Sequence, residues 1–160
     1  MLIGLETRPL DGDGLRELLP DTDLLIGAAL IAGEHAPHLL DRAMIASMPE
    51  GAVFVDVSID QGGISETSRP TSFEAPAYVE AGVIHCCLPN LPAAVPLSST
   101  QALTHATFPY VQMLAGGIEA VLSRNAALRH GINVWDGAIR HAAVADALGL
   151  PYVPWEGARV

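Results

Sequence analysis

Residues Ala52 to Ser58, AVFVDVS, decide the fold. This run is short and continuously apolar rather than alternating, which is typical of a strand buried on both faces of a parallel sheet. A similar run, LLIGAAL, precedes it at Leu24 to Leu30, and GVIHCCL follows at Gly82 to Leu88. Each predicts a further buried strand. The sequence therefore indicates an α/β fold built on a parallel sheet.

A short helix is expected between the first two strands, over residues 40–48. Its apolar residues recur at helical spacing: Leu40, Met44, Ile45 and Met48. Asp41 stands in the first turn, where a carboxylate favours the helix dipole, and Pro49 ends the helix. Strand, helix and strand joined by short loops form a parallel crossover unit.

The second half of the chain predicts mainly helices. Ser98 and Gln101 have capping-box spacing and are expected to open a long helix, which Pro109 should kink or split. Two glycines at 116–117 weaken its end. Asp136-Gly137 predicts a hairpin turn within residues 132–140, and a helix is expected over residues 142–148.

Charge and composition exclude several classes of protein. Eight basic residues, all arginine, stand against 18 acidic ones, and the net charge is -10. A nucleic-acid or anionic membrane surface needs clustered cations, so both partners are disfavoured. No signal peptide is recognisable, and the longest apolar run, Leu24 to Ala32, is too short to span a bilayer. We therefore expect a cytoplasmic protein.

The cysteines and histidines do not indicate a metal site. Adjacent Cys86 and Cys87 are expected to be unbridged small hydrophobic residues. His35 and His38 have an H-x-x-H spacing, but Pro37 intervenes and no third ligand is evident, so surface histidines are expected. His85 is predicted to be a hydrogen-bonded interior or edge histidine.

A polar loop, residues 59–76, follows the central strand. Two of its features are candidates for binding. DQGG, at Asp60 to Gly63, places a carboxylate and two glycines where ligands bind in open parallel sheets. The alternative is a turn in which the aspartate caps nearby amides. Arg69 could hold a phosphate or carboxylate by a two-pronged contact, or could be a solvated loop charge. Gly12-Asp13-Gly14 fails as a dinucleotide fingerprint because Glu17 occupies the third glycine position.

Three long stretches resemble the alanine dehydrogenase family. They are VDVSIDQGGISETSRPT within MIASMPEGAVFVDVSIDQGGISETSRPT, LPNLPAAVPLSSTQALTHATFPYVQML and RNAALRHGINVWDGAIRHAAVADALGLPY. A further stretch, DLLIGAALIAGEHAPHLL, precedes them, and the resemblance extends from about Asp21 to Tyr152. It implies oxidation of L-alanine by NAD, with water, to pyruvate, ammonium and NADH. The related transhydrogenase subunits, which would imply a membrane partner, carry other residues in place of Asp60 and Gln61.

The resemblance assigns site residues one by one. It places Ala29 and Leu30 on the adenosine side of NAD, and Arg69 among the cofactor contacts. It matches Val57, Ser58, Ile59 and Asp60 to the strand end beside the ribose and nicotinamide, with Asp60 as the catalytic aspartate. A further cofactor loop comprises Leu88, Pro89, Asn90 and Leu91. The family more often has V-A-N-M in this loop, so Leu88-Pro89 departs from the pattern.

The fold implied is an incomplete Rossmann-type parallel sheet, the second half of an NAD-binding domain, followed by C-terminal helices. Residues 1–98 are expected to form this partial domain. Residues 99–160 are expected to form the segment that in the family packs back on the catalytic domain. A third Rossmann strand would lie near MLIGLE, at residues 1–6, and the next strand, at residues 24–30, would expose a hydrophobic edge.

The family's substrate-binding arginine and lysine, its catalytic histidine and its glycine loop would all lie upstream. We therefore expect the chain alone to be inactive or nearly so. The alternatives are half of a split enzyme with a complementary chain, a non-catalytic interaction module, or a gene remnant. A homo-oligomer is a further expectation from the family.

Overall fold

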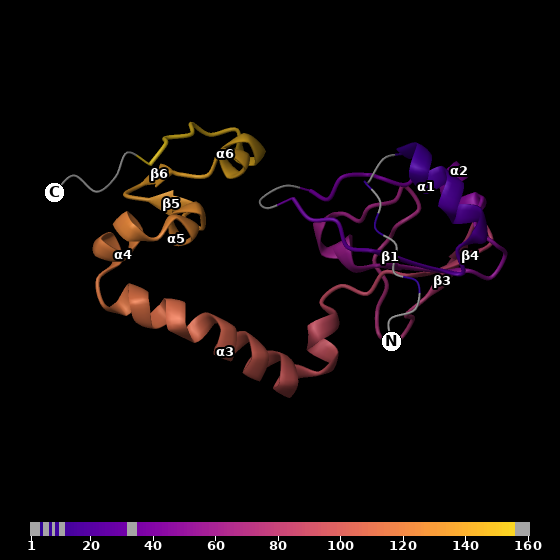
Figure 1. Ribbon diagram of the computed structural model, residues 1–160, viewed down its shortest axis with the longest axis horizontal. Coiled ribbons are helices and arrows are strands. Elements are labelled where there is room, and N and C mark those ends of the chain that lie inside the picture. Colours follow the sequence, from indigo (N-terminus) through magenta and orange to yellow (C-terminus); the bar gives the residue numbers. More distant parts are fainter. Residues whose placement is uncertain (1–3, 5–6, 8, 10–11, 32–34, 156–160) are drawn as a thin grey trace. The chain divides into compact units, whose positions relative to one another are not determined.

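The computed structural model describes residues 12–31 and 35–155, together with residues 4, 7 and 9 (Figure 1). The chain forms two compact units, the first ending at Leu91 and the second beginning at Pro92. The strand expected over residues 1–6 lies outside the described residues, Gly4 excepted.

A four-stranded sheet forms the first unit, in the order β1-β2-β4-β3. Strands β1 (Leu24–Gly27), β2 (Val53–Asp56) and β4 (Val83–Cys86) are parallel. Strand β3 (Tyr78–Glu80) runs antiparallel to β4 at the edge and was not expected, because three residues after a polar loop give no strand pattern. The predicted α/β fold with parallel strands is confirmed.

The strands are shorter than the apolar runs that predict them. Ala28 to Leu30 lie beyond β1, and Val57 and Ser58 lie beyond β2, in the 3₁₀ helix η2 (Val57–Gln61). Leu88 likewise lies beyond β4. The predicted strand ends were wrong because the chain turns there, and apolar residues continue into the turns.

Helices α1 (Gly12–Leu18) and α2 (Arg42–Ala46) pack against the sheet, with the 3₁₀ helix η1 (Leu19–Asp21) between α1 and β1 (Figure 1). Helix α2 confirms the helix predicted between the strands, although it is shorter. Asp41 is its N-cap, and the carboxylate accepts a hydrogen bond from the Met44 N–H at 2.7 Å. The N-cap thus satisfies a backbone donor that the helix leaves unpaired.

One face of the sheet carries the hydrophobic core. Phe54 on β2 and Val83 on β4 are fully buried on this face, where they meet Ile45 of α2. The buried residues of this cluster are Leu19, Ala36, Leu40, Met44, Ile45, Met48, Ala52, Phe54, Ile64 and Val83.

The opposite face of the sheet is largely uncovered. Leu24 and Ile26 on β1 are 56% and 61% exposed, and Val79 on β3 is 66% exposed. The expectation that the strands are buried on both faces is therefore wrong for the part of the chain that is described. Within that part, β1 pairs with β2 alone, so its hydrophobic edge is open as expected.

The second unit is mainly helical. After the 3₁₀ helix η3 (Leu91–Ala94), it contains α3 (Pro96–Ala115), α4 (Ile118–Arg124), α5 (Ala126–His130) and α6 (Ala142–Leu148), with a small hairpin of β5 (Val134–Trp135) and β6 (Ala138–Ile139). The hairpin turn at Asp136-Gly137 is confirmed, and both residues have positive φ, at 49° and 70°.

Two details of α3 differ from expectation. The helix begins at Pro96 with no side-chain cap, so Ser98 lies inside it and the predicted capping box is wrong. Pro109 does not split it, because the turns on both sides keep their hydrogen bonds and one missing donor does not end a long helix. The break comes at Gly116 and Gly117, as expected.

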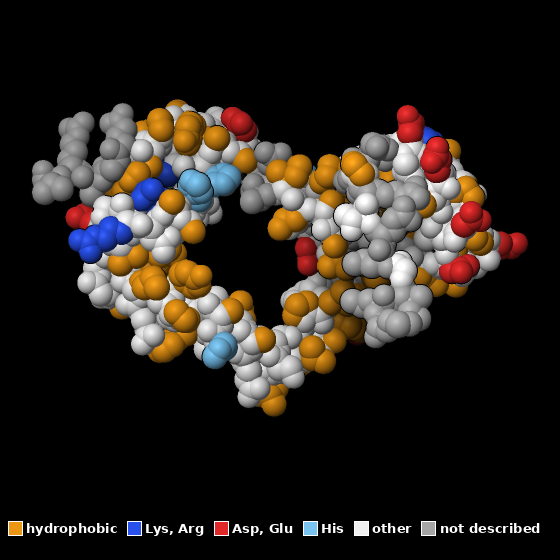
Figure 2. Space-filling model, viewed as in Figure 1, with side chains coloured by type: hydrophobic (Ala, Val, Ile, Leu, Met, Phe, Trp, Pro, Cys, Tyr) orange, Lys and Arg blue, Asp and Glu red, His pale blue; other side chains and the backbone are white. Residues whose placement is uncertain are grey.

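Helix α3 exposes many large apolar side chains, visible as orange side chains along it in Figure 2. They include Leu97, Leu103, Phe108, Val111 and Met113. Among the described residues, no helix is both long enough and apolar enough to cross a bilayer.

Glycine is required at position 27, where β1 passes close to the loop above it. A Cβ built on Gly27 would overlap Ile64 Cδ1 and would lie 2.9 Å from Ile64 Cγ1. We expect Gly27→Ala to destabilise the protein by about 1–3 kcal/mol, because the core must move to accept it. Adding Ile64→Val, which removes Cδ1, should recover part of this loss in urea unfolding. A Gly27→Ala variant as stable as the parent would contradict the packing described.

Candidate functional site

A buried carboxylate organises the carboxyl end of the sheet. Asp56, the last residue of β2, is 1% exposed. It accepts hydrogen bonds from the backbone N–H of Ser58 at 3.0 Å and of Ile64 at 2.9 Å, and from Ser68 Oγ at 2.6 Å. The side chain therefore caps η2 and ties the polar loop back onto the strand that precedes it.

The second glycine of DQGG lies against this carboxylate. Gly63 has a φ of 81°, and a Cβ there would lie 2.8 Å from Asp56 Oδ2 and 2.7 Å from Ser68 Cβ. Glycine is thus needed at this position for a contact within the protein. This close packing explains why glycine stands at position 63, and no contact with a ligand is needed to explain it.

Two of the segments expected to bind cofactor meet at Ser58. Its hydroxyl donates to the carbonyl oxygen of Ala29 at 2.8 Å, which joins the end of β2 to the end of β1. Leu30 is 67% exposed and Val57 is 44% exposed beside this contact, whereas Ile59 is buried. The strand ends therefore present apolar side chains outward, and Ile59 packs inward.

A second contact brings Asp60 to the loop after β4. The Asn90 N–H donates to Asp60 Oδ2 at 3.0 Å, and Asn90 has a φ of 51°. Both residues are exposed, and Leu88 and Pro89 are half-buried beside them, while Leu91 is 37% exposed. Residues 30 positions apart are thus joined through the carboxylate that the family resemblance marks as catalytic.

Arg69 rests on an aromatic ring at the same end of the sheet. Its guanidinium carbon lies 3.7 Å from the centroid of the Tyr78 ring. Its backbone N–H donates to Tyr78 Oη at 2.9 Å. Together with the hydrogen bond from Arg42, its charge helps to lower the pKa of the Glu80 carboxyl. Within the described residues Arg69 nevertheless forms no ion pair, so its guanidinium donors are available to an anion.

His85 of β4 is the cross-strand partner of Tyr78 of β3, and it is fully buried. Nδ1 lies 3.0 Å from the Val83 carbonyl oxygen, which can only accept, so Nδ1 carries the hydrogen. Nε2 therefore accepts from Thr67 Oγ1, at 2.8 Å. Burial lowers the pKa of His85 below its ordinary value, so the ring is neutral at neutral pH. The expectation of a hydrogen-bonded interior histidine is confirmed.

The remaining candidates behave as ordinary structural residues. Cys86 and Cys87 are both free thiols, and Cys87 is buried. His35 and His38 are exposed, as expected of surface histidines. In the described stretches of chain, no three His, Cys, Asp or Glu side chains are grouped so as to hold a metal ion.

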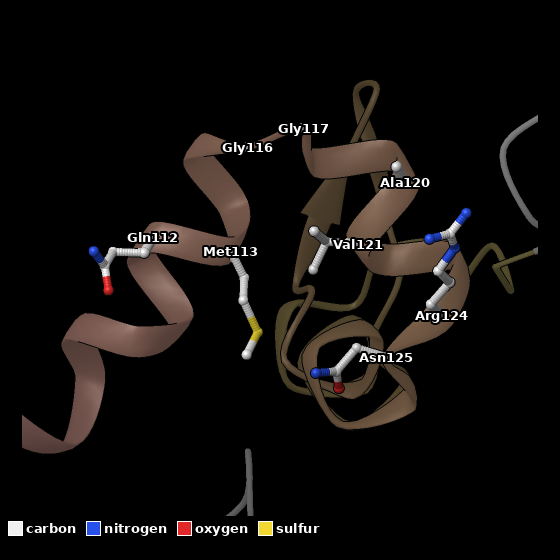
Figure 3. A pocket seen from close by; sticks show the side chains of 8 residues that line it. All are labelled: Gln112, Met113, Gly116, Gly117, Ala120, Val121, Arg124 and Asn125. Carbon is white, nitrogen blue, oxygen red and sulfur yellow. The ribbon is translucent and has the colours of Figure 1, made fainter.

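An apolar cavity of about 280 Å³ adjoins the end of β1. Leu25, Gly27, Ala29, Leu39 and Ile64 contribute to its lining, so it lies beside Ala29. A second cavity, of about 480 Å³, lies in the other unit between the end of α3 and α4. There Met113 and Val121 face each other across the gap, and no carboxylate or histidine lines it (Figure 3).

Sequence reasoning missed Asp56, Tyr78 and Thr67. Asp56 could have been noticed as the one charged residue inside an otherwise apolar run, since such a residue must find partners when buried. No pattern marks Tyr78 or Thr67, because their contacts depend on the pairing of β3 with β4.

With this geometry in place, comparison with known proteins identifies the family. Residues 4–142 match the family model described as alanine dehydrogenase/PNT, C-terminal domain. The chain belongs to this family. It is 49% identical over 142 residues to the alanine dehydrogenase of Halomonas elongata, which covers 88% of this chain and 38% of that protein. The alanine dehydrogenase of Bacillus subtilis is 44% identical over 146 residues, covering 90% and 39% respectively.

Solved structures agree with the sequence comparisons. An L-alanine dehydrogenase superposes with a TM-score of 0.69 at 40% identity, covering 87% of this chain and 38% of that one. A transhydrogenase from Sinorhizobium meliloti gives a TM-score of 0.51 at 28% identity, covering 56% and 25%. The chain thus spans about 38% of the length of the alanine dehydrogenases it resembles, and corresponds to their C-terminal portion.

Loss of the Asp56 charge should loosen the whole site. Asp56→Asn replaces one accepting oxygen by an NH₂ group that faces a donor. We expect it to lower the free energy of unfolding by about 2–3 kcal/mol. Urea unfolding followed by circular dichroism measures the change, and exposed Asp23→Asn is the matched control. An Asp56→Asn variant no less stable than Asp23→Asn would contradict a stabilising role for the hydrogen bonds to Asp56.

The buried state of His85 predicts an effect of acid. Because its pKa is lowered in the folded protein, its contribution to stability is fully present above the ordinary value of 6.5 and is lost as pH falls through the folded-state pKa. In a ¹H NMR titration, the resonance that His85→Gln removes should titrate below the ordinary histidine value of 6.5. Titration of that resonance at or above 6.5 would show that the ring is not buried as described.

Proposed function

We propose that this chain is the cofactor-binding part of an NAD-dependent alanine dehydrogenase. The observation that carries the proposal is the hydrogen bond from the Asn90 N–H to the Asp60 carboxylate. It brings together, at the carboxyl edge of a parallel sheet, the two loops that the family resemblance assigns to the cofactor. Ligands of open α/β sheets bind at this edge.

The residues present fit a dinucleotide. The apolar cavity beside Ala29 suits the flat adenosine end, and exposed Leu30 and Val57 could cover the sugar and ring faces. Arg69, which forms no ion pair among the described residues, could hold an anionic group of the cofactor. In this assignment residues 1–98 form the partial cofactor domain, and residues 99–160 pack against the rest of the enzyme.

The proposed chemistry centres on Asp60. When bound, NAD would supply the hydride acceptor for the oxidation of L-alanine to pyruvate and ammonium. Asp60 is exposed, and one of its oxygens is held by the Asn90 N–H. That bond fixes the carboxylate and leaves its other oxygen, Oδ1, to orient a reacting group or to hold a proton near it. The remaining substrate-binding groups would come from the part of the relatives that this chain does not match.

A second candidate is a non-catalytic interaction module. It is favoured by the uncovered apolar face of the sheet, formed by Leu24, Ile26 and Val79. Isothermal titration with NAD separates the two candidates, since only the first predicts saturable binding and a raised melting temperature. A well-folded chain without affinity for NAD would remove the first proposal.

Activity should depend on Asp60 when the N-terminal portion of a relative is supplied. We expect this chain, mixed with the unmatched N-terminal portion of the Halomonas elongata enzyme, to form NADH from L-alanine and NAD. Asp60→Asn should lower the rate at least about a hundredfold, because it loses the carboxylate that orients and holds the proton. Asp23→Asn, an exposed aspartate before β1, is the control. Equal rates for the two variants would exclude a catalytic role for Asp60.

A further inference from the structure

A row of aromatic rings crosses the core face of the sheet. The register places Tyr78 of β3 opposite His85 of β4, and His85 beside Phe54 of β2. Tyr78 and His85 stack with centroids 4.9 Å apart and an interplanar angle of 22°. Phe54 and His85 meet edge-on, at 5.3 Å and 85°. The row therefore fixes the plane of the Tyr78 ring from within the fold.

Hydrogen bonds lock the row in place. Thr67 Oγ1 bonds both His85 Nε2 and Ser65 Oγ, so the imidazole cannot rotate without breaking a buried network. The Tyr78 hydroxyl donates to the Thr67 carbonyl oxygen at 2.7 Å. Burial raises the pKa of the Tyr78 phenol, so the hydroxyl keeps the proton that it donates.

Arg69 is held by Tyr78 at both ends of the residue. The backbone N–H of Arg69 donates to the hydroxyl, while the guanidinium carbon lies 3.7 Å from the ring centroid. A cation over a tyrosine face is attracted by the ring quadrupole and keeps its N–H donors free at its edges. An exposed arginine on a loop would otherwise lose much rotamer freedom on binding an anion.

We propose that Tyr78 is a positioning residue that sets Arg69 to receive an oxyanion at the carboxyl edge of the sheet. The proposal rests on the proposed function for its ligand, which is either a phosphate of the dinucleotide or the carboxylate of the small substrate. Tyr78 itself touches neither ligand. It acts through Arg69, and His85 with Phe54 holds Tyr78 in turn.

The positioning can be tested without any ligand. In the folded chain, the ring current of Tyr78 should move the Arg69 Nε–H resonance upfield, and Arg69→Lys identifies that resonance. Tyr78→Phe keeps the ring and should keep the shift, whereas Tyr78→Leu should abolish it. An Arg69 signal at the ordinary position in the unsubstituted chain would overturn the proposal, whatever becomes of the variants.

Titration with NAD and with pyruvate tests the consequence. We expect Tyr78→Leu to weaken the binding of at least one of them about threefold to tenfold, while Tyr78→Phe stays closer to the parent. Tyr110→Leu, at an exposed tyrosine of α3, is the control, and melting temperatures exclude unfolded variants. Unchanged affinity for both ligands in folded Tyr78→Leu would overturn the proposal. If the parent binds neither ligand, the proposed function fails, and the NMR result still decides whether Tyr78 holds Arg69.

Discussion

The candidate site depends on the hydrogen bonds that converge on the Asp56 carboxylate. A charge that is 1% exposed is stable only when donors surround it, and here Ser58, Ile64 and Ser68 supply them. The same bonds fold the chain into η2 and draw the polar loop back over the strand end. This arrangement leaves Asp60 exposed at the rim of the sheet.

Contacts between loops then build the site from segments far apart in the sequence. The Ser58 hydroxyl joins the end of β2 to Ala29, and Asp60 joins it to Asn90 after β4. Arg69 adds the cationic group, seated on the Tyr78 ring. A carboxylate, a cation and apolar side chains thus lie at one edge of a rigid sheet, an arrangement suited to a charged, partly aromatic ligand.

One face of the sheet is uncovered among the described residues. Parallel sheets are ordinarily covered on both faces, because their strands are apolar on both sides. Here one face carries the core, while Leu24, Ile26 and Val79 on the other are more than half exposed. Alanine dehydrogenases that resemble this chain are much longer, since the chain covers about 38% of their length. Burial of this face by further protein would also stabilise the strands that position Asp56 and Asp60.

The sequence by itself determined the α/β class, the three parallel strands, the short helix between the first two of them and the family, because apolar runs, helical spacing and long motifs are local signals. It also pointed to the loops that meet at the carboxyl edge. Only the tertiary structure decided that Gly63 packs against the Asp56 carboxylate, that β3 pairs with β4, and that the Arg69 guanidinium lies over the Tyr78 ring. These contacts join residues whose proximity depends on strand register and loop path, and no local pattern records either.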